Sequence, residues 1–210
     1  MSRYTGPSCR LCRREGEKLF LKGIRCYTEK CAIGRRAKSP MPGQHGSAPR
    51  KQKEYGAQLR EKQKAKRIYG LHETQFKNLF KRAEKKEGMA GVNLLTLLET
   101  RLDNVVYKMG MAESRREARQ LVTHRHFRIN GKKANIPSMT LAIGDVVSVE
   151  ESSRSLEKIK DLIANLDNRQ AVNWLDVDRN EITATVVSLP AREDIDFPFK
   201  EHLIVELYSK

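Results

Sequence analysis

Long apolar segments are missing from this 210-residue sequence. No run approaches the length of a membrane span, and the opening residues MSRYTGPS lack the apolar core of a secretory signal. We therefore expect a cytoplasmic protein with no membrane partner. Because the cytoplasm disfavours disulfides, the four cysteines of the chain need another explanation.

Catalytic groupings are missing as well. The sequence has no glycine-rich phosphate loop, no Ser/His/Asp set and no metal site that would leave a coordination position open. Asp103 is the one carboxylate that invites a catalytic interpretation, but ion-pair networks commonly imitate catalytic sites. We interpret it as a structural group paired with Arg101 or with a backbone amide. The sequence thus predicts no catalytic residue, no small-molecule substrate and no enzyme.

Acidic residues are few, because 26 Asp and Glu stand against 41 Lys and Arg, which gives a net charge of +15. The excess is uneven: residues 1–70 hold 19 cations and 5 anions, whereas residues 134–210 hold 8 cations and 14 anions. This balance favours a polyanionic partner, nucleic acid first and an anionic membrane surface second. The acidic C-terminal part would face away from that partner or meet a basic protein.

Cysteine is confined to the N-terminal region, as Cys9-x-x-Cys12 and Cys26-x-x-x-x-Cys31. Four thiolates in two close pairs supply the tetrahedral ligand set of a structural metal site. Zinc is the first choice for this site, and an iron–sulfur cluster suits the same four ligands. The alternative without a metal is a group of four free or buried thiols.

Periodic apolar positions predict three helices, over residues 54–69, 72–87 and 92–107. Tyr55 and Leu59 begin the apolar stripe of the first helix. Its other face is cationic and carries Arg60, Lys64 and Arg67. In the second helix a core face follows the helical period, with Phe76, Leu79, Phe80 and Ala83. We therefore expect this aromatic pair in the core rather than as a base-stacking platform.

Residues 99–133 predict a helix, a turn, a second helix and a β-hairpin. Ser114 and Glu117 form a capping box, in which the serine oxygen takes an amide of the first turn and the glutamate returns to the cap amide. Asn130-Gly131 is the strongest short-range signal for a two-residue hairpin turn. The second helix turns a core stripe inward and is expected to project three arginines outward, Arg115, Arg116 and Arg119. Planar guanidiniums suit phosphate, so nucleic-acid contact is favoured over a solvated face.

The remaining sequence predicts more strands than helices. Alternating apolar residues indicate strands over 141–150, 174–177 and 182–189, whereas helical spacing indicates a helix over 155–166. The single tryptophan, Trp174, is expected in the core. The tail over 201–208 fits either a helical face or a strand.

Several motifs resemble one family. The run RLDNVVYKMGMAESRREARQLVTHRHFRINGKK resembles the RNA-binding module named after ribosomal protein S4, which also occurs in pseudouridine synthases and some tyrosyl-tRNA synthetases. The opening RYTGP, the cysteine segment, the PGQHG linker, the helix LREKQKAKRIYG and the closing HLIVELYSK follow the bacterial ribosomal protein S4 family in the same order. The resemblance therefore covers nearly the whole chain.

This resemblance implies an α+β fold in three parts. They are a four-cysteine metal knuckle with a basic extension over 1–45, a helical domain over 46–98 that is completed by a docked helix in 198–210, and an S4-type RNA-binding domain over 99–197 with an antiparallel sheet and helices. An extended linker follows the knuckle. The implied partners are 16S rRNA, ribosomal protein S5 and other small-subunit proteins, and mRNA near the channel through which it enters. The implied roles are nucleation of 30S assembly at a 5′-domain helix junction, translational accuracy and, in some members, repression of their own mRNA.

Charge and motif together define the predicted RNA-binding set. Its members are Arg3, Arg10, Arg13, Arg14, Arg35, Arg36, His45, Arg50, Lys53, Tyr55, Arg60, Lys62, Lys64, Lys66, Arg67, Arg115, Arg116, Arg119, His124, Arg128, Lys132 and Lys133. Two alternatives stay open. An enzyme that borrows the module would need a separate catalytic domain, which the regions outside 99–190 do not suggest. A DNA-binding regulator would need a dimerisation element, and none is evident.

Overall fold

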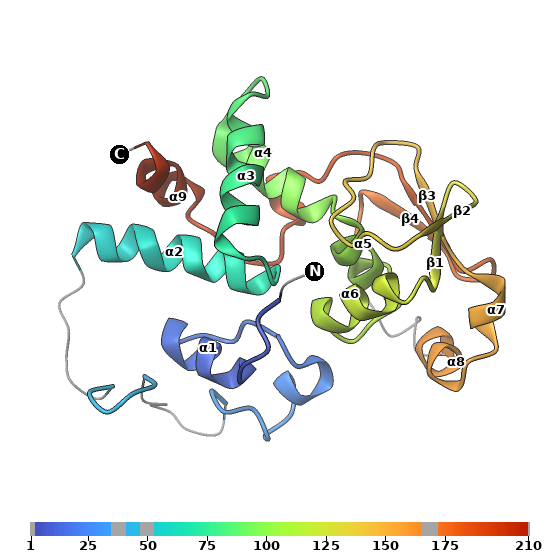
Figure 1. The fold of residues 1–210 in the computed structure, drawn as a ribbon, viewed down its shortest axis with the longest axis horizontal. Helices are drawn as coiled ribbons and strands as arrows, with labels where there is room; N and C mark the ends of the chain where they lie inside the picture. Colours follow the sequence, from blue (N-terminus) through green and yellow to red (C-terminus); the bar gives the residue numbers. More distant parts are fainter. Residues whose placement is uncertain (1–2, 35–40, 47–52, 165–171, 210) are drawn as a thin grey trace. The chain divides into compact units, whose positions relative to one another are not determined.

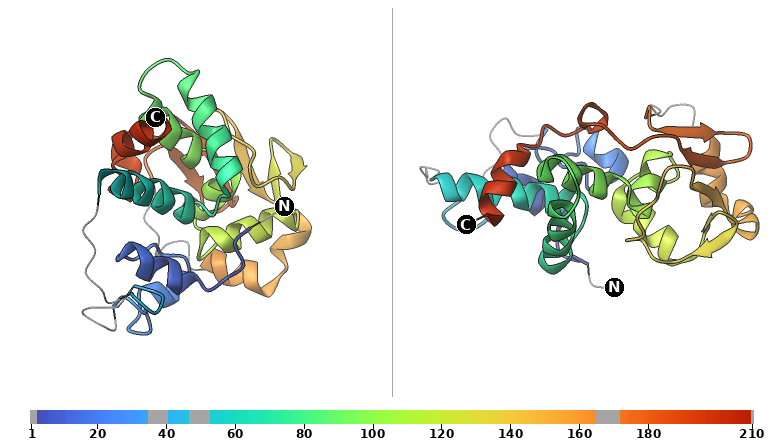
Figure 2. Two further views of the ribbon diagram at one scale, coloured as in Figure 1. Left: turned by 60° about the vertical axis from the view of Figure 1, so that its left-hand side comes forward. Right: turned by 90° about the horizontal axis from the view of Figure 1, so that it is seen from above.

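The computed structural model describes residues 3–34, 41–46, 53–164 and 172–209. Three members of the predicted RNA-binding set, Arg35, Arg36 and Arg50, lie outside these residues. Within them, the search for a helix long and apolar enough to cross a lipid bilayer finds none. The chain divides into two compact units, shown as ribbons in Figures 1 and 2. Unit 1 combines Met1–Val92 with Pro198–Lys210, and unit 2 is Asn93–Phe197.

Unit 1 is built from helices. They are α1 (Ser8–Glu15), the 3-10 turn η1 (Gly23–Cys26), α2 (Glu54–Ile68), α3 (Glu73–Glu84), the start of α4 (Ala90–Glu99), and α9 (Glu201–Tyr208). The tail that fitted a helix or a strand is thus a helix, and α9 packs against α2 (Figure 1). At the start of α3 the His72 N–H donates to Oε1 of Gln75 at 3.2 Å, which closes the helix N-terminus.

The core of unit 1 uses the aromatic residues of α3, as the helical period predicts. Phe76 and Phe80 are fully buried, and the Tyr208 ring of α9 stacks on Phe80 with ring centroids 4.5 Å apart. The expectation that Tyr55 begins the apolar stripe of α2 is wrong, since 60% of its surface is exposed. The same helix instead buries Gln58, whose amide donates to carboxylates of Glu54 and Glu206.

Unit 2 consists of helices and one antiparallel sheet. The helices are the end of α4, then α5 (Leu102–Lys108), α6 (Arg115–Thr123), α7 (Glu151–Arg154) and α8 (Glu157–Ala164). The strands are β1 (Phe127–Ile129), β2 (Lys132–Ala134), β3 (Val146–Val149), β4 (Leu175–Asp178) and β5 (Thr183–Val186), in the order β2-β1-β3-β5-β4. An α+β fold with an antiparallel sheet is therefore confirmed.

The expected single helix over residues 92–107 is wrong. α4 ends at Glu99 and α5 begins at Leu102. Between the two helices the backbone bonds to the loop that precedes β3: the Leu102 N–H donates to the Met139 carbonyl at 2.8 Å, and the Leu141 N–H donates to the Thr100 carbonyl at 2.9 Å. These bonds take the place of helical ones, so the chain turns there.

The predicted hairpin is confirmed. β1 pairs with β2 in the register that sets Ile129 opposite Lys132, and the two loop residues, Asn130 and Gly131, have φ values of 48° and 77°. Positive φ at both central positions matches a tight turn whose twist suits the paired strands, and asparagine and glycine tolerate it best. The turn holds Lys132 at the exposed edge of the sheet.

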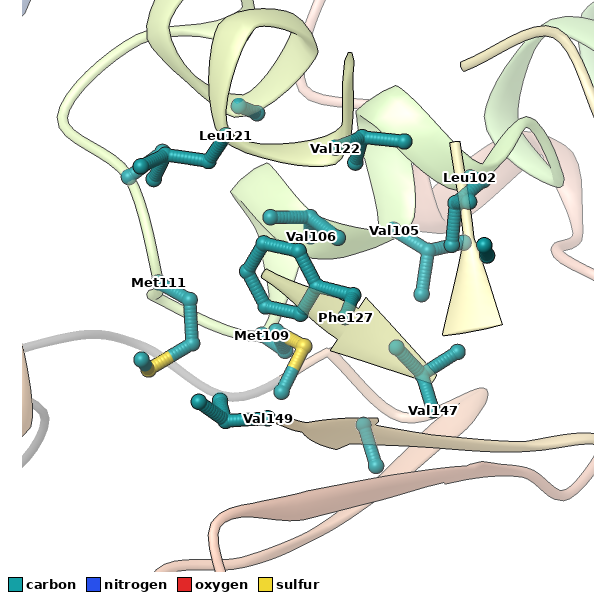
Figure 3. Close-up of a cluster of buried hydrophobic side chains, with 14 of the residues drawn as sticks. Leu102, Val105, Val106, Met109, Met111, Leu121, Val122, Phe127, Val147 and Val149 are labelled. Carbon is teal, nitrogen blue, oxygen red and sulfur yellow. The ribbon is translucent and has the colours of Figure 1, made fainter. Parts of the chain in front are cut away.

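One hydrophobic core joins the sheet of unit 2 to α5 and α6. Figure 3 shows Phe127, Val147 and Val149 of the sheet close to Val106 of α5 and Val122 of α6. The predicted core stripe of α6 is buried, with Ala118, Leu121 and Val122. The expectation for Trp174 is confirmed too, because no part of its surface is exposed.

Candidate nucleic-acid interface

Helix α6 begins at a side-chain cap. The Ser114 Oγ accepts the Glu117 N–H at 3.3 Å, as the capping box predicts. The Glu117 carboxylate reaches back to the Glu113 N–H at 2.7 Å, which is one residue before the expected amide. The Lys158 ammonium of α8 also pairs with Glu117. The cap fixes where α6 starts and therefore which face each of its arginines occupies.

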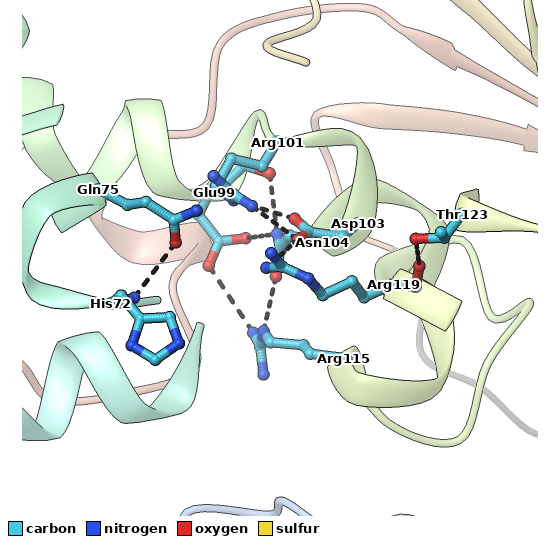
Figure 4. A network of polar contacts seen from close by, with 9 residues as sticks. All are labelled: His72, Gln75, Glu99, Arg101, Asp103, Asn104, Arg115, Arg119 and Thr123. Atoms are coloured by element: carbon cyan, nitrogen blue, oxygen red, sulfur yellow. Dashed lines mark hydrogen bonds and ion pairs between the residues drawn. The ribbon is translucent and has the colours of Figure 1, made fainter. Parts of the chain in front are cut away.

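Two arginines of α6, Arg115 and Arg119, point into a buried network of polar contacts. Asp103 of α5 accepts two hydrogen bonds from Arg101, at 3.0 and 2.7 Å, and lies 3.5 Å from Arg119 of α6 (Figure 4). All three residues are buried. The interpretation of Asp103 as a structural carboxylate paired with Arg101 is confirmed.

Arg115 belongs to the same network. Its Nε donates to the Asn104 Oδ1 at 2.7 Å (Figure 4). Its guanidinium also lies 4.6 Å from the centre of the Tyr107 ring. The expectation that Arg115, Arg116 and Arg119 all project from α6 is therefore wrong for two of them. α5 carries the carboxylate and the amide that draw Arg115 and Arg119 inward, whereas Arg116 is exposed.

Exposed basic residues of unit 2 include one in the first turn of α6 and others between the end of α6 and the hairpin. Arg116, His124, Lys132 and Lys133 are exposed as predicted. Arg125 is also exposed, between α6 and β1, with a φ of 65° that only the folded backbone reveals. The prediction missed it, although the basic run around it was a signal. The four Lys and Arg side chains among these five residues are exposed cations that can meet phosphate.

Arg128 of β1 is paired with a carboxylate that directly follows β3. It donates two hydrogen bonds to Glu150, at 2.7 and 2.8 Å, and Lys133 lies 3.8 Å from the same group. The hydrogen bond with Glu150 raises the pKa of Arg128, and the same bond lowers the pKa of Glu150. The Arg128 guanidinium is therefore less available to bind phosphate than the Lys132 ammonium.

The cations of α2 are all engaged with carboxylates. Arg60 and Arg67 pair with Glu15 of α1, Lys62 and Lys66 with Glu73 of α3, and Lys64 with Glu17 and Glu61. The expected cationic face of α2 exists, but it is neutralised within unit 1. Sequence spacing missed this because Glu15 and Glu73 come from other helices.

Glu73 is the most strongly perturbed carboxylate among these partners. Burial alone would raise its pKa, but hydrogen bonds from Lys62 and Lys66 outweigh that effect and lower the pKa to about 2. Glu73 also accepts a hydrogen bond from the Tyr208 hydroxyl at 3.1 Å. Burial and the Glu73 charge in turn raise the pKa of Tyr208. Glu73 is thus an anion throughout the physiological pH range.

The N-terminal members of the predicted set lie on unit 1 with differing exposure. Arg3, Arg10, His45, Lys53 and Tyr55 are exposed, whereas Arg13 and Arg14 are half-buried. The Arg14 Nη1 lies 3.9 Å from the Met41 Sδ. The placement of these side chains is compatible with RNA binding, and their role in it stays a prediction.

The four cysteines converge on one small cavity. Cys9, Cys12, Cys26 and Cys31 all line it, and all four are free thiols. Backbone groups hydrogen-bond to three sulfurs: that of Leu19 to Cys12, the Lys22 N–H to Cys26 at 3.4 Å, and those of Gly34 and Ile33 to Cys31. In the ranges that the structure describes, no three His, Cys, Asp or Glu side chains are arranged to hold a metal ion as they lie.

The thiols differ in how easily they ionise. Burial raises the pKa of Cys12 and of Cys26, and charge on the other cysteines raises it further. Burial acts the same way on Cys31, but its backbone hydrogen bonds and the nearby Lys18 outweigh it and lower the pKa. Crowded thiolates repel one another, and a bound cation would relieve that repulsion.

Two family models match the chain. One is described as the ribosomal protein S4/S9 N-terminal domain and matches residues 3–99, and the other is described as the S4 domain and matches residues 100–147. Relatives named small ribosomal subunit protein uS4 are 61% identical in Clostridioides difficile (strain 630), 59% in Caldicellulosiruptor saccharolyticus and 56% in Heliobacterium modesticaldum. Each of these alignments spans 100% of both chains.

Proposed function

This chain belongs to the ribosomal protein S4 family, and from that premise we propose that it binds 16S rRNA at a helix junction of the 5′ domain and nucleates assembly of the 30S body. It is an RNA-binding constituent of the small ribosomal subunit, and it works in the cytoplasm. The observation that carries this conclusion is the match of both family models in order, together with relatives that align over the full length. The members of this family are structural proteins of the ribosome, so the chain is not an enzyme that borrows the RNA-binding module.

Further partners follow from the same premise. We propose that the protein meets ribosomal protein S5 and other small-subunit proteins, lies near the channel through which mRNA enters, and contributes to translational accuracy. Repression of its own mRNA is part of the same proposal. The acidic balance of residues 134–210, with 14 anions against 8 cations, supports a basic protein neighbour on that part of the chain.

The mechanism of binding starts with electrostatics. Exposed cations such as Arg116 and Lys132 capture phosphates and release counterions, after which the shape of a folded junction decides specificity. The cap at Ser114 and the tight hairpin hold these cations on a rigid frame. The buried network around Asp103 fixes α6 against α5, so Arg119 supports this frame.

The first prediction concerns binding to a 5′-domain fragment of 16S rRNA, measured over a range of salt concentrations with excess tRNA as competitor. Binding should survive tRNA, and log Kd should vary linearly with log salt. Arg116→Ala and Lys132→Ala should each flatten that slope by about one, because each removes one phosphate contact. Lys160→Ala on α8 is the matched control, because it also removes one exposed cation of unit 2 but lies outside the predicted RNA-binding set. If tRNA removes the binding, the charge acts generically and the proposed function is wrong.

We propose that Cys9, Cys12, Cys26 and Cys31 together bind one zinc ion. Four thiols around one cavity, with backbone hydrogen bonds to three sulfurs, fit a structural tetrahedral site. Bound zinc would neutralise the crowded thiolates and tie α1 to η1, while the thiols close in on the cavity. An iron–sulfur cluster remains the alternative on the same residues.

The second prediction concerns this metal. Protein purified without chelators should hold about one zinc per chain by elemental analysis, since four thiolates complete one tetrahedral site. A strong chelator should then expose all four thiols to a thiol reagent and reduce the helical signal in circular dichroism. Cys26→Ser should lower the zinc content. Visible absorption with stoichiometric iron would support the cluster, and fully reactive thiols without metal would contradict both.

A further inference from the structure

The carboxylates that engage α2 differ in their own exposure. Glu73 and Glu17 have side chains that are 46% and 40% exposed, whereas those of their partners Lys62 and Lys64 are only 10% exposed. The reverse holds for Glu15, which is 3% exposed beside Arg60 at 26%. Glu73 and Glu17 therefore lie on the solvent side of their lysines, and Glu15 lies on the inner side of its arginines.

This order decides what an approaching polyanion meets. The Glu73 Oε1 lies 2.5 Å from the Lys62 Nζ and its Oε2 lies 2.9 Å from the Lys66 Nζ, so one carboxylate covers two ammonium groups. The Glu17 Oε1 lies 2.8 Å from the Lys64 Nζ, and the Glu61 Oε1 lies 3.6 Å from the same nitrogen. A phosphate can reach these lysines only by displacing a carboxylate of the same charge. Such an exchange releases few counterions, so it adds little to non-specific binding.

We propose that Glu17 and Glu73 are specificity-determining residues, which withhold the lysines of α2 from any RNA that does not place phosphates there. The proposal rests on the RNA-binding function inferred above. An RNA held at other points of the protein presents its phosphates to α2 at high effective concentration and displaces the carboxylates. A loosely bound RNA does not, because a phosphodiester gains almost nothing over the carboxylate already in place.

Glu15 plays a different part. Its buried carboxylate joins Arg60 and Arg67 of α2 to α1, and burial raises its pKa although both arginines lower it. Loss of this group would loosen α1 from α2. The structure thus separates an inner carboxylate that holds unit 1 together from two outer carboxylates that cover lysines.

The test compares Glu73→Gln and Glu17→Gln with Glu84→Gln, an equally large charge change on the exposed end of α3. Glutamine keeps the shape of glutamate and can still accept the hydrogen bond from Tyr208. The full-length, metal-replete proteins are titrated with tRNA and with a 5′-domain fragment of 16S rRNA over a range of salt concentrations. Thermal unfolding confirms that each variant is folded. Glu73 accepts a hydrogen bond from Tyr208 of α9, whereas Glu17 pairs with Lys64 of α2, so Glu17→Gln keeps the test valid if Glu73→Gln unfolds.

Relative to Glu84→Gln, tRNA should bind Glu73→Gln about two- to fivefold more tightly, as expected for freed surface ion-pair partners. The salt slope should steepen by about one for each lysine released. Glu73→Gln releases Lys62 and Lys66, whereas Lys64 keeps Glu61 at 3.6 Å after Glu17→Gln, so the slope should steepen more for Glu73→Gln than for Glu17→Gln. Affinity for the 16S fragment should rise less than affinity for tRNA, so the variant should prefer the 16S fragment over tRNA less strongly than the wild type does. Equal effects of Glu73→Gln, Glu17→Gln and Glu84→Gln on tRNA would overturn the proposal. If the wild type fails to prefer the 16S fragment, the proposed function is wrong, while the slopes for tRNA still decide the role of the two carboxylates.

Discussion

Asp103→Ala is expected to lower the free energy of unfolding of unit 2 by about 3–5 kcal/mol. The substitution leaves the Arg101 and Arg119 guanidiniums buried without the carboxylate that pairs with both. An uncompensated buried charge costs far more than the loss of a solvent-exposed ion pair. Because Arg119 lies on α6, the exposed Arg116 of that helix should also be held less firmly, and binding to rRNA should weaken.

Urea unfolding followed by fluorescence measures this effect, since the single tryptophan, Trp174, lies fully buried in the core of unit 2. Asp176→Ala on the exposed side of β4 is the control and should change stability by no more than about 0.5 kcal/mol. Asp103→Asn keeps the shape and one acceptor oxygen, so its effect should be smaller than that of alanine. A loss below about 1 kcal/mol for Asp103→Ala would mean that the network does not stabilise the unit.

Removal of Pro198–Lys210 is expected to unfold unit 1 while unit 2 stays folded. This segment supplies the buried Ile204 and Phe199, each worth about 1.5–3 kcal/mol by burial, and the Tyr208 ring that stacks on Phe80. The total of about 5 kcal/mol is comparable to the whole stability of a small domain. The truncated chain should therefore lose the helical signal of unit 1 yet keep the fluorescence of Trp174.

Two point variants sharpen this prediction. Ile204→Ala should destabilise unit 1 by about 2–5 kcal/mol, because the methyl groups leave a cavity at a fully buried site. His202→Ala, on the exposed face of α9, should have almost no effect. Circular dichroism during thermal unfolding follows the helices of unit 1. If the truncated protein unfolds as the full chain does, α9 is an accessory rather than a part of the core.

Local features of the fold could be predicted because their causes are local. The period of Phe76 and Phe80 places them in a core whichever helix packs against them. Asn130-Gly131 makes its turn through its own backbone preferences, and the cap at Ser114 needs only residues within four positions. The prediction of a single helix over 92–107 was wrong because its cause is not local: hydrogen bonds with Met139 and Leu141, which are distant in the sequence, interrupt the helix.

The sequence by itself determined the class of fold, the basic character of the chain and the motifs that place it in its family. Only the tertiary structure decided which cations are available to RNA. Arg115 and Arg119 turn inward because α5 brings Asp103 and Asn104 beside them, and the cations of α2 are covered because Glu15 and Glu73 arrive from other helices. Helical spacing fixes the face of a helix that a side chain occupies, but the charge it meets there depends on which distant segment packs against that face.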